Sequence, residues 1–134
     1  MIALAAIAVT IGVVGALGAI ARRRWMVVTV RGHSMTPTLH SGDRLVVRRW
    51  IRGAMPAVGD VIVFLPDERG YRIKRVAAIA GDPVPAWLGR DPGACIPAGH
   101  VIVRGDNPRS EGSRQLGYIP IGAIIARHVA GRSH

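Results

Sequence analysis

The first 21 residues form one apolar stretch without a charged side chain. A helix rises 1.5 Å per residue, so this stretch reaches about 30 Å, the thickness of a bilayer's hydrocarbon core. Glycine and alanine recur along it, and both are tolerated in membrane helices. We therefore expect residues 1–21 to form a transmembrane anchor.

A cleaved secretory signal is the alternative interpretation, with Ala19-Ile20-Ala21 as a small-x-small cleavage site. Two features favour a retained anchor: no basic residue precedes the apolar run, and the run is longer than the apolar core of a typical signal peptide.

Beyond Trp25 the pattern changes to short runs rich in valine and isoleucine, each bounded by glycine, proline or aspartate. No amphipathic helix of more than two turns is evident there. The prediction is a mainly β fold, a small antiparallel folded or barrel-like sheet, in a domain covering 22–134. Residues 82–99 are rich in proline and glycine and predict a long loop or a rudimentary hairpin. The expected strands cover 26–31, 43–49, 60–65, 71–79, 100–104 and 123–129.

The chain carries a formal net charge of +10. This excess favours an anionic partner, and lipid headgroups are the natural one beside an anchor. No nucleic-acid-binding motif is present, so we expect no nucleic acid partner. The single cysteine, Cys95, and the five histidines show no metal-ligand spacing. We expect neither a metal nor a cofactor.

Lys74 is the only lysine, because seventeen of the eighteen basic residues are arginine. Arginine stays protonated in proteins, whereas a desolvated lysine can become neutral and act as a base. From the lysine count alone, the simpler interpretation is that a compositional bias towards arginine left a single lysine. Strand alternation places Arg72, Lys74 and Val76 on one face and Ile73 and Arg75 on the other.

Several short segments match a known family in order. They are Gly-x-Ser-Met-x-Pro-Thr-Leu at 32–39, Gly-Asp at 42–43 and 59–60, Lys-Arg-Val at 74–76 with Gly-Asp at 81–82, and Gly-Asp-Asn at 105–107 followed by Ser-Arg at 113–114 and Gly-Tyr-Ile-Pro at 117–120. Together they resemble the type I signal peptidase family over nearly all of 26–129. Several boxes in register are far more specific than one motif.

The resemblance implies a single-pass membrane-bound serine endopeptidase, which removes signal or leader peptides from exported preproteins after small-x-small residues. Ser34 would be the nucleophile and Lys74 the general base. The catalytic domain would be extracytoplasmic. The arginines at 22–24 conflict with that side, because positive charge flanking a span favours the cytoplasm.

The resemblance also assigns supporting roles. The Ser34 N–H would hold the oxyanion, and Gly32 stands where some members supply a serine hydroxyl. Ser110 would orient Lys74, with Ser113 as the competing candidate. Arg75 and Asp106 would form a structural ion pair.

Two departures from the family concern the last box. Residues 107–114 are one residue shorter than usual. Gly112 replaces an aspartate and so removes the usual partner of Arg114, for which Glu111 is a candidate substitute.

Five apolar residues would line shallow pockets that admit only small side chains. The same residues serve equally as the core of a small β domain. They are Val28, Val30, Met35, Leu39 and Ile73.

Four other interpretations stay open. One is a peptidase dedicated to a single precursor, and another is a catalytically weak, membrane-tethered peptide-binding module. A third is a self-cleaving regulator, which would instead carry a DNA-binding domain and no span. A triad of Ser34 with His40 or His100 lacks any marked acid–histidine pairing.

Overall fold

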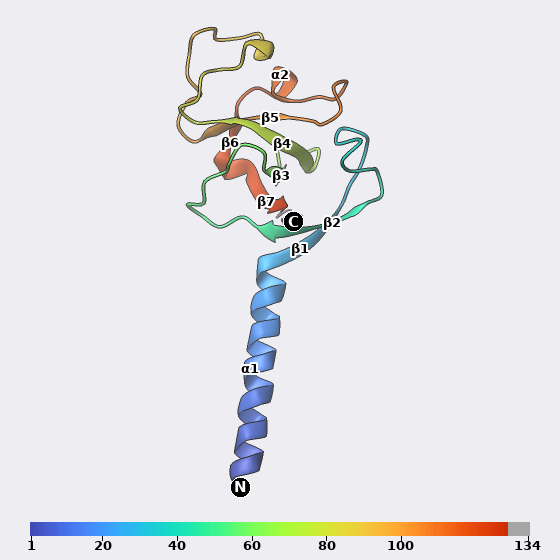
Figure 1. The fold of residues 1–134 in the computed structure, drawn as a ribbon, viewed down its shortest axis with the longest axis vertical. Coiled ribbons are helices and arrows are strands. Elements are labelled where there is room, and N and C mark those ends of the chain that lie inside the picture. Colours follow the sequence, from blue (N-terminus) through green and yellow to red (C-terminus); the bar gives the residue numbers. More distant parts are fainter. Residues whose placement is uncertain (129–134) are drawn as a thin grey trace, which may run out of the picture.

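A long helix and a curved sheet make up the computed structural model, which describes residues 1–128 (Figure 1). The expected strand end at Val129, and the rest of 129–134, lie outside the described residues. Helix α1 (Ile2–Arg24) projects from the β domain, with the N-terminus at its far end.

No residue of α1 is buried by protein. It is the one helix among the described residues that is long and apolar enough to cross a membrane, judged by length and composition. It ends three residues later than the expected anchor, so it includes the arginines at 22–24. An apolar helix of this length that no other part of the protein covers fits a membrane-anchored protein, because its apolar side chains are stable in lipid but not in water.

The rest of the described chain is a seven-stranded antiparallel sheet in the order β1-β2-β7-β3-β4-β5-β6. In Figure 1 the sheet curls rather than lying flat. The predicted fold class is therefore confirmed. The strands are β1 (Trp25–Thr29), β2 (Arg44–Arg49), β3 (Val61–Phe64), β4 (Arg72–Ile79), β5 (His100–Arg104), β6 (Ile119–Pro120) and β7 (Ile124–His128).

The sheet is buried on both faces at its centre, where all four residues of β3 are buried. Val61 and Val63 pack with Ile73 in one core cluster, whereas Ile62 and Phe64 pack with residues of β5 and β7 in a second. This division follows the side-chain alternation along a strand. A curled sheet can enclose apolar side chains on its concave side while loops cover the other.

All six predicted strands are present, with ends that differ by at most two residues where the structure describes them. Residues 82–99 do form a rudimentary hairpin, with one bridge between Pro83 and Cys95 and a single 3-10 turn, η1 (Ala86–Leu88). Strand β6, helix α2 (Ser113–Leu116) and the turn η2 (Ile121–Ala123) were not predicted.

Candidate active site

Ser34 lies in the loop that joins β1 to β2. Two backbone hydrogen bonds close this loop beyond the strands, from Val30 N to Asp43 O at 2.8 Å and from Gly42 N to Val30 O at 2.8 Å. The Leu39 N–H donates to Met35 O at 2.8 Å, which adds an internal turn. The half-buried Ser34 therefore belongs to a loop whose two ends are fixed by the sheet.

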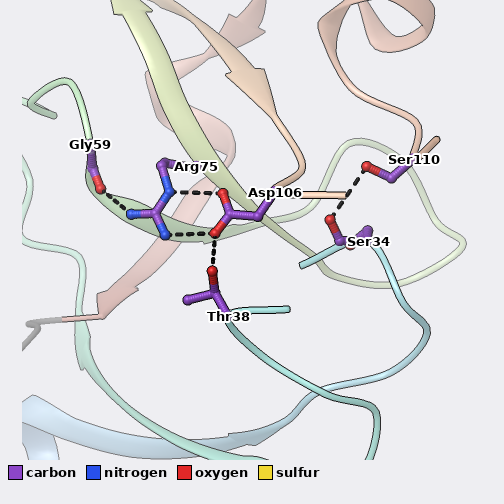
Figure 2. Close-up of polar contacts among 6 residues, drawn as sticks. All are labelled: Ser34, Thr38, Gly59, Arg75, Asp106 and Ser110. Atoms are coloured by element: carbon purple, nitrogen blue, oxygen red, sulfur yellow. Dashed lines mark hydrogen bonds and ion pairs between the residues drawn. The ribbon is translucent and has the colours of Figure 1, made fainter. Parts of the chain in front are cut away.

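A second loop, after β5, holds the Ser34 loop in place. The backbone N–H of Asn107 donates to Ser34 O at 2.9 Å, and the Asn107 side-chain amide donates to His33 O at 3.0 Å. The Ser110 hydroxyl lies 3.3 Å from Ser34 O (Figure 2). These contacts join two segments that are more than seventy residues apart in the sequence.

Lys74 lies in β4, between β3 and β5, with only 3% of its surface exposed. Arg75 is paired with Arg104 of β5. Continuing this antiparallel register by one residue places Gly105 opposite Lys74. Directly opposite residues present their side chains on the same face of a sheet. The Lys74 side chain therefore projects from the same face of the sheet as a side chain at position 105 would.

Gly105 contacts both serines. A Cβ on this residue would lie 2.5 Å from Ser34 O and closer still to Ser110 Oγ. Since that Cβ would point to the same side as Lys74, the register brings Ser34, Lys74 and Ser110 to one face of the β4–β5 pair. In the described part of the chain, no hydrogen bond joins the Ser34 hydroxyl to the Lys74 amine. Catalytic hydrogen bonds often tighten only when substrate binds.

The pKa of Lys74 is lowered from its ordinary value, mainly because burial removes water from the ammonium. The charge of Glu111 acts in the opposite direction and raises it, and the positive charge of Arg72 lowers it further. The arrangement favours a neutral amine, which is the form that can accept a proton.

Ser110 and Ser113 make different contacts. The Ser110 hydroxyl donates to Asn107 O at 2.7 Å and faces Ser34 O. The Ser113 hydroxyl is fully buried and accepts the N–H of Val103 at 2.8 Å. Ser113 thus satisfies a backbone donor of β5, whereas Ser110 lies on the face shared by Ser34 and Lys74.

Arg75 and Asp106 form an ion pair on the opposite face of β4. Arg75 Nε donates to Asp106 Oδ1 at 2.8 Å and Nη2 to Oδ2 at 2.7 Å, while Nη1 donates to Gly59 O at 2.9 Å. The Thr38 hydroxyl donates to the same carboxylate at 2.6 Å (Figure 2). The pKa of Asp106 is lowered, first by its hydrogen bonds to Arg75. The pair links β4, the loop after β5 and the Ser34 loop.

Close packing at Gly112 accounts for one departure from the family pattern. A Cβ on Gly112 would lie 3.1 Å from Val103 O, so an aspartate there would crowd β5. Arg114 is exposed, and its backbone carbonyl accepts a hydrogen bond from Arg90 at 3.0 Å. No ion pair joins Arg114 to Glu111 within residues 1–128.

Gly32 precedes the nucleophile candidate in a left-handed conformation, with φ of 79°. This conformation favours glycine over a residue with a side chain. Its N–H donates to Ser41 Oγ at 3.3 Å.

A groove of about 160 Å³ adjoins Ser34 between the end of β1 and the start of β4. Val30, Met35 and Ile73, three of the five expected substrate contacts, line it. Val28 and Leu39 do not; Val28 is a core residue, and Leu39 packs against the same core cluster. Arg31, Arg69 and Arg72 also line the groove, although no motif in the sequence marks them as part of the site.

The described residues form an apolar helix followed by a β domain, with a buried lysine on the same face as a loop serine. Two comparisons with known proteins bear on this arrangement. The family model described as "Signal peptidase, peptidase S26" matches residues 2–88, which include Ser34 and Lys74. The chain belongs to this family.

A relative from Synechocystis sp. (strain ATCC 27184 / PCC 6803 / Kazusa), described as "Probable signal peptidase I-1", is 37% identical over 123 residues. The alignment covers 69% of this chain and 63% of the relative. The chain therefore spans less than two thirds of that relative's length.

Proposed function

We propose that this chain is a membrane-anchored serine endopeptidase that removes signal peptides from exported preproteins. The family supports peptide-bond hydrolysis as the reaction class. The observation that carries the proposal is the position of Lys74, which is buried, has a lowered pKa, and shares one face with Ser34 across Gly105. A neutral amine beside a serine is what a Ser–Lys dyad requires.

In the proposed acylation step, neutral Lys74 takes the proton of the Ser34 hydroxyl while Oγ attacks the scissile carbonyl. The tetrahedral intermediate then collapses, the Lys74 ammonium gives its proton to the leaving amine, and an acyl-enzyme remains on Ser34. Water, deprotonated by Lys74, attacks the ester, and the Lys74 ammonium gives this proton to Ser34 Oγ as the second product leaves. Lys74 ends the cycle neutral, so protons balance.

The oxyanion would be held by the backbone N–H of Ser34. Gly32 offers no hydroxyl, so the side-chain donor of some family members is absent at that position. Removing one such donor costs about 3 kcal/mol in other enzymes. We expect a lower rate than in a member with a serine there, unless a backbone group fills the role.

Preference for small residues would follow from the groove beside Ser34. Val30, Met35 and Ile73 line it, and Met35 is 1% exposed with little room to move. Close-packed apolar walls reject larger side chains by steric clash. Alanine-sized residues at the first and third positions before the cut are therefore the expected substrates.

The proposed organisation places the anchor at 1–21 and the catalytic domain at 22–134, on the extracytoplasmic side. Helix α1 supports an anchor, and Trp25 with the preceding arginines suits a lipid interface. The arginines at 22–24 oppose that side by the positive-inside rule. A reporter fused after residue 134 tests the topology, and a cytoplasmic signal would contradict export processing.

Purified full-length protein in detergent tests the chemistry with a preprotein that carries a small-x-small site. Ser34→Ala and Lys74→Ala should each abolish cleavage while leaving the domain folded by circular dichroism. Retained cleavage by Lys74→Ala would refute the dyad. Binding of the peptide by the wild type without any cleavage would instead indicate a peptide-binding module.

A further inference from the structure

The groove beside Ser34 is basic as well as apolar. Arg31, Arg69 and Arg72 contribute to its lining, and among the described residues no aspartate or glutamate does. Arg31 and Arg69 are exposed, whereas Arg72 is half-buried. Three guanidinium groups around a groove of about 160 Å³ create a positive potential that an incoming peptide meets next to the nucleophile candidate.

Arg72 has an unused donor. Its Nε is buried and has no hydrogen-bond partner within residues 1–128. Buried polar groups in folded proteins nearly always have a partner, and an unpaired one calls for an explanation. A rotation of the half-buried Arg72 side chain into the groove would let an acceptor carried by the substrate satisfy this donor.

Within residues 1–128, the two acidic residues at the same turn, Asp67 and Glu68, form no ion pair with the arginines of the groove. Asp67 Oδ1 accepts the backbone N–H of Arg69 at 2.8 Å, and this contact shapes the turn. The guanidinium groups are therefore available to a ligand.

We infer that the groove selects preproteins that carry an aspartate or glutamate side chain within a few residues of the scissile bond. This inference rests on the proposed peptidase function and adds a charge requirement to its preference for small residues. The planar guanidinium fork matches a carboxylate in two parallel hydrogen bonds. A peptide suits the groove better than a lipid headgroup, because Ser34 lines it together with the apolar residues Val30, Met35 and Ile73.

Pairs of synthetic peptides provide the test, each with one small-x-small site and with either glutamate or glutamine at a single position flanking the cut. The full chain in neutral detergent is assayed for kcat/KM on each pair. We expect glutamate to be preferred about tenfold at one or more positions, as one charge-assisted hydrogen bond supplies about that factor. The preference should fall as salt is raised.

Arginine variants show which side chains carry the preference. Arg72→Gln should bring the glutamate-to-glutamine ratio towards one, and Arg69→Gln or Arg31→Gln provides a second variant at an exposed position. Arg52→Gln is the matched control, because this exposed arginine lies in the turn that follows β2, outside the groove lining. Arg72 also influences Lys74, but a ratio of two peptides on one variant cancels a common change in the dyad.

The outcomes separate this inference from the proposed function. Equal rates on glutamate and glutamine peptides would overturn the carboxylate preference and leave the peptidase intact. If the wild type cleaves neither peptide, the proposed function fails, and the affinities of the peptides for Ser34→Ala then decide the carboxylate preference by themselves. Arginine variants that weaken binding to vesicles of anionic lipid, with an unchanged peptide ratio, would assign the charge to the membrane and refute the inference.

Discussion

Gly105 and Ser34 approach each other so closely that no side chain fits between them. A Cβ on Gly105 would lie 2.5 Å from the Ser34 carbonyl oxygen, which belongs to backbone and cannot swing aside. This contact locates the Ser34 loop against the end of β5, opposite Lys74. The glycine of the Gly-Asp-Asn box thus leaves room for the Ser34 loop on the face of the sheet from which Lys74 projects.

The first prediction is that Gly105→Ala lowers the proposed peptidase activity by about 100-fold. The added methyl must displace Ser34 or Ser110, and a displacement of about 1 Å in a catalytic group can cost about 100-fold in rate. Overpacking should also lower the free energy of unfolding by about 1–3 kcal/mol. Cleavage rates and urea unfolding of the full chain in detergent measure both effects.

Gly122→Ala is the control, because its Cβ would meet nothing within 4 Å. Equal effects in the two variants would show that close packing at Gly105 is not the cause.

The second prediction separates the two serines of the last box. Ser110→Ala should lower kcat by about 10–100-fold with little change in stability, since its hydroxyl faces the site and its loss leaves Asn107 O near solvent. Ser113→Ala should instead leave the buried Val103 N–H without its acceptor, at a cost of about 1–3 kcal/mol in unfolding free energy.

Rates for these two serine variants must be expressed per folded molecule, with the folded fraction taken from circular dichroism. A larger loss of rate in Ser113→Ala than in Ser110→Ala would show that Ser113 orients Lys74 and that the last box is aligned wrongly.

The strands could be predicted from the sequence because each one is a local run of β-branched residues between turn residues. The order of the strands could not, since β7 inserts between β2 and β3, and this depends on non-local pairing. Strand β6 and helix α2 have two and four residues, which is too few for a periodic signal.

The residues of the candidate site could be predicted where a family motif contains them. Ser34, Lys74, Arg75 and Asp106 stand in matching boxes, and the structure places the last two in an ion pair. Val28 shares a face with Val30 by alternation, yet only Val30 reaches the groove, because the groove begins where β1 ends. Of the three arginines of the groove, Arg69 and Arg72 are three residues apart, whereas Arg31 follows β1, so its proximity to the other two emerges only in the fold.

The third prediction concerns the pair of Arg75 and Asp106. Asp106→Asn should lower the free energy of unfolding by about 1–3 kcal/mol at pH 7, since a charged acceptor of three hydrogen bonds is lost. The folded pKa of Asp106 is depressed, so its contribution is complete above the unfolded value of about 3.9 and is lost as pH falls through the folded pKa. The difference between wild type and variant should therefore shrink below about pH 4.

Urea unfolding across pH, followed by tryptophan fluorescence, measures this dependence. Thr38→Val removes a single hydrogen bond to the same carboxylate from an exposed hydroxyl, so its cost should be the smaller of the two. A stability difference for Asp106→Asn that stays constant down to pH 2 would show that ionisation of Asp106 is not its source.

The fourth prediction uses Glu111 to test whether Lys74 is the base. In the proposed mechanism cleavage requires neutral Lys74, so kcat/KM should rise with pH through the pKa of this amine, at a lower pH than for an exposed lysine because burial lowers that pKa. The charge of Glu111 raises the pKa of Lys74, so Glu111→Gln should lower this pKa further and move the rising limb to lower pH.

Because Glu111 is exposed, high salt should reduce this displacement of the rising limb. Glu68→Gln removes a carboxylate that is not among the charges acting on the pKa of Lys74 and should leave the limb in place. A limb that Glu111→Gln does not move at low salt, or that both variants move equally, would mean that the group titrating in the profile is not Lys74, and the general base would then have to be sought elsewhere.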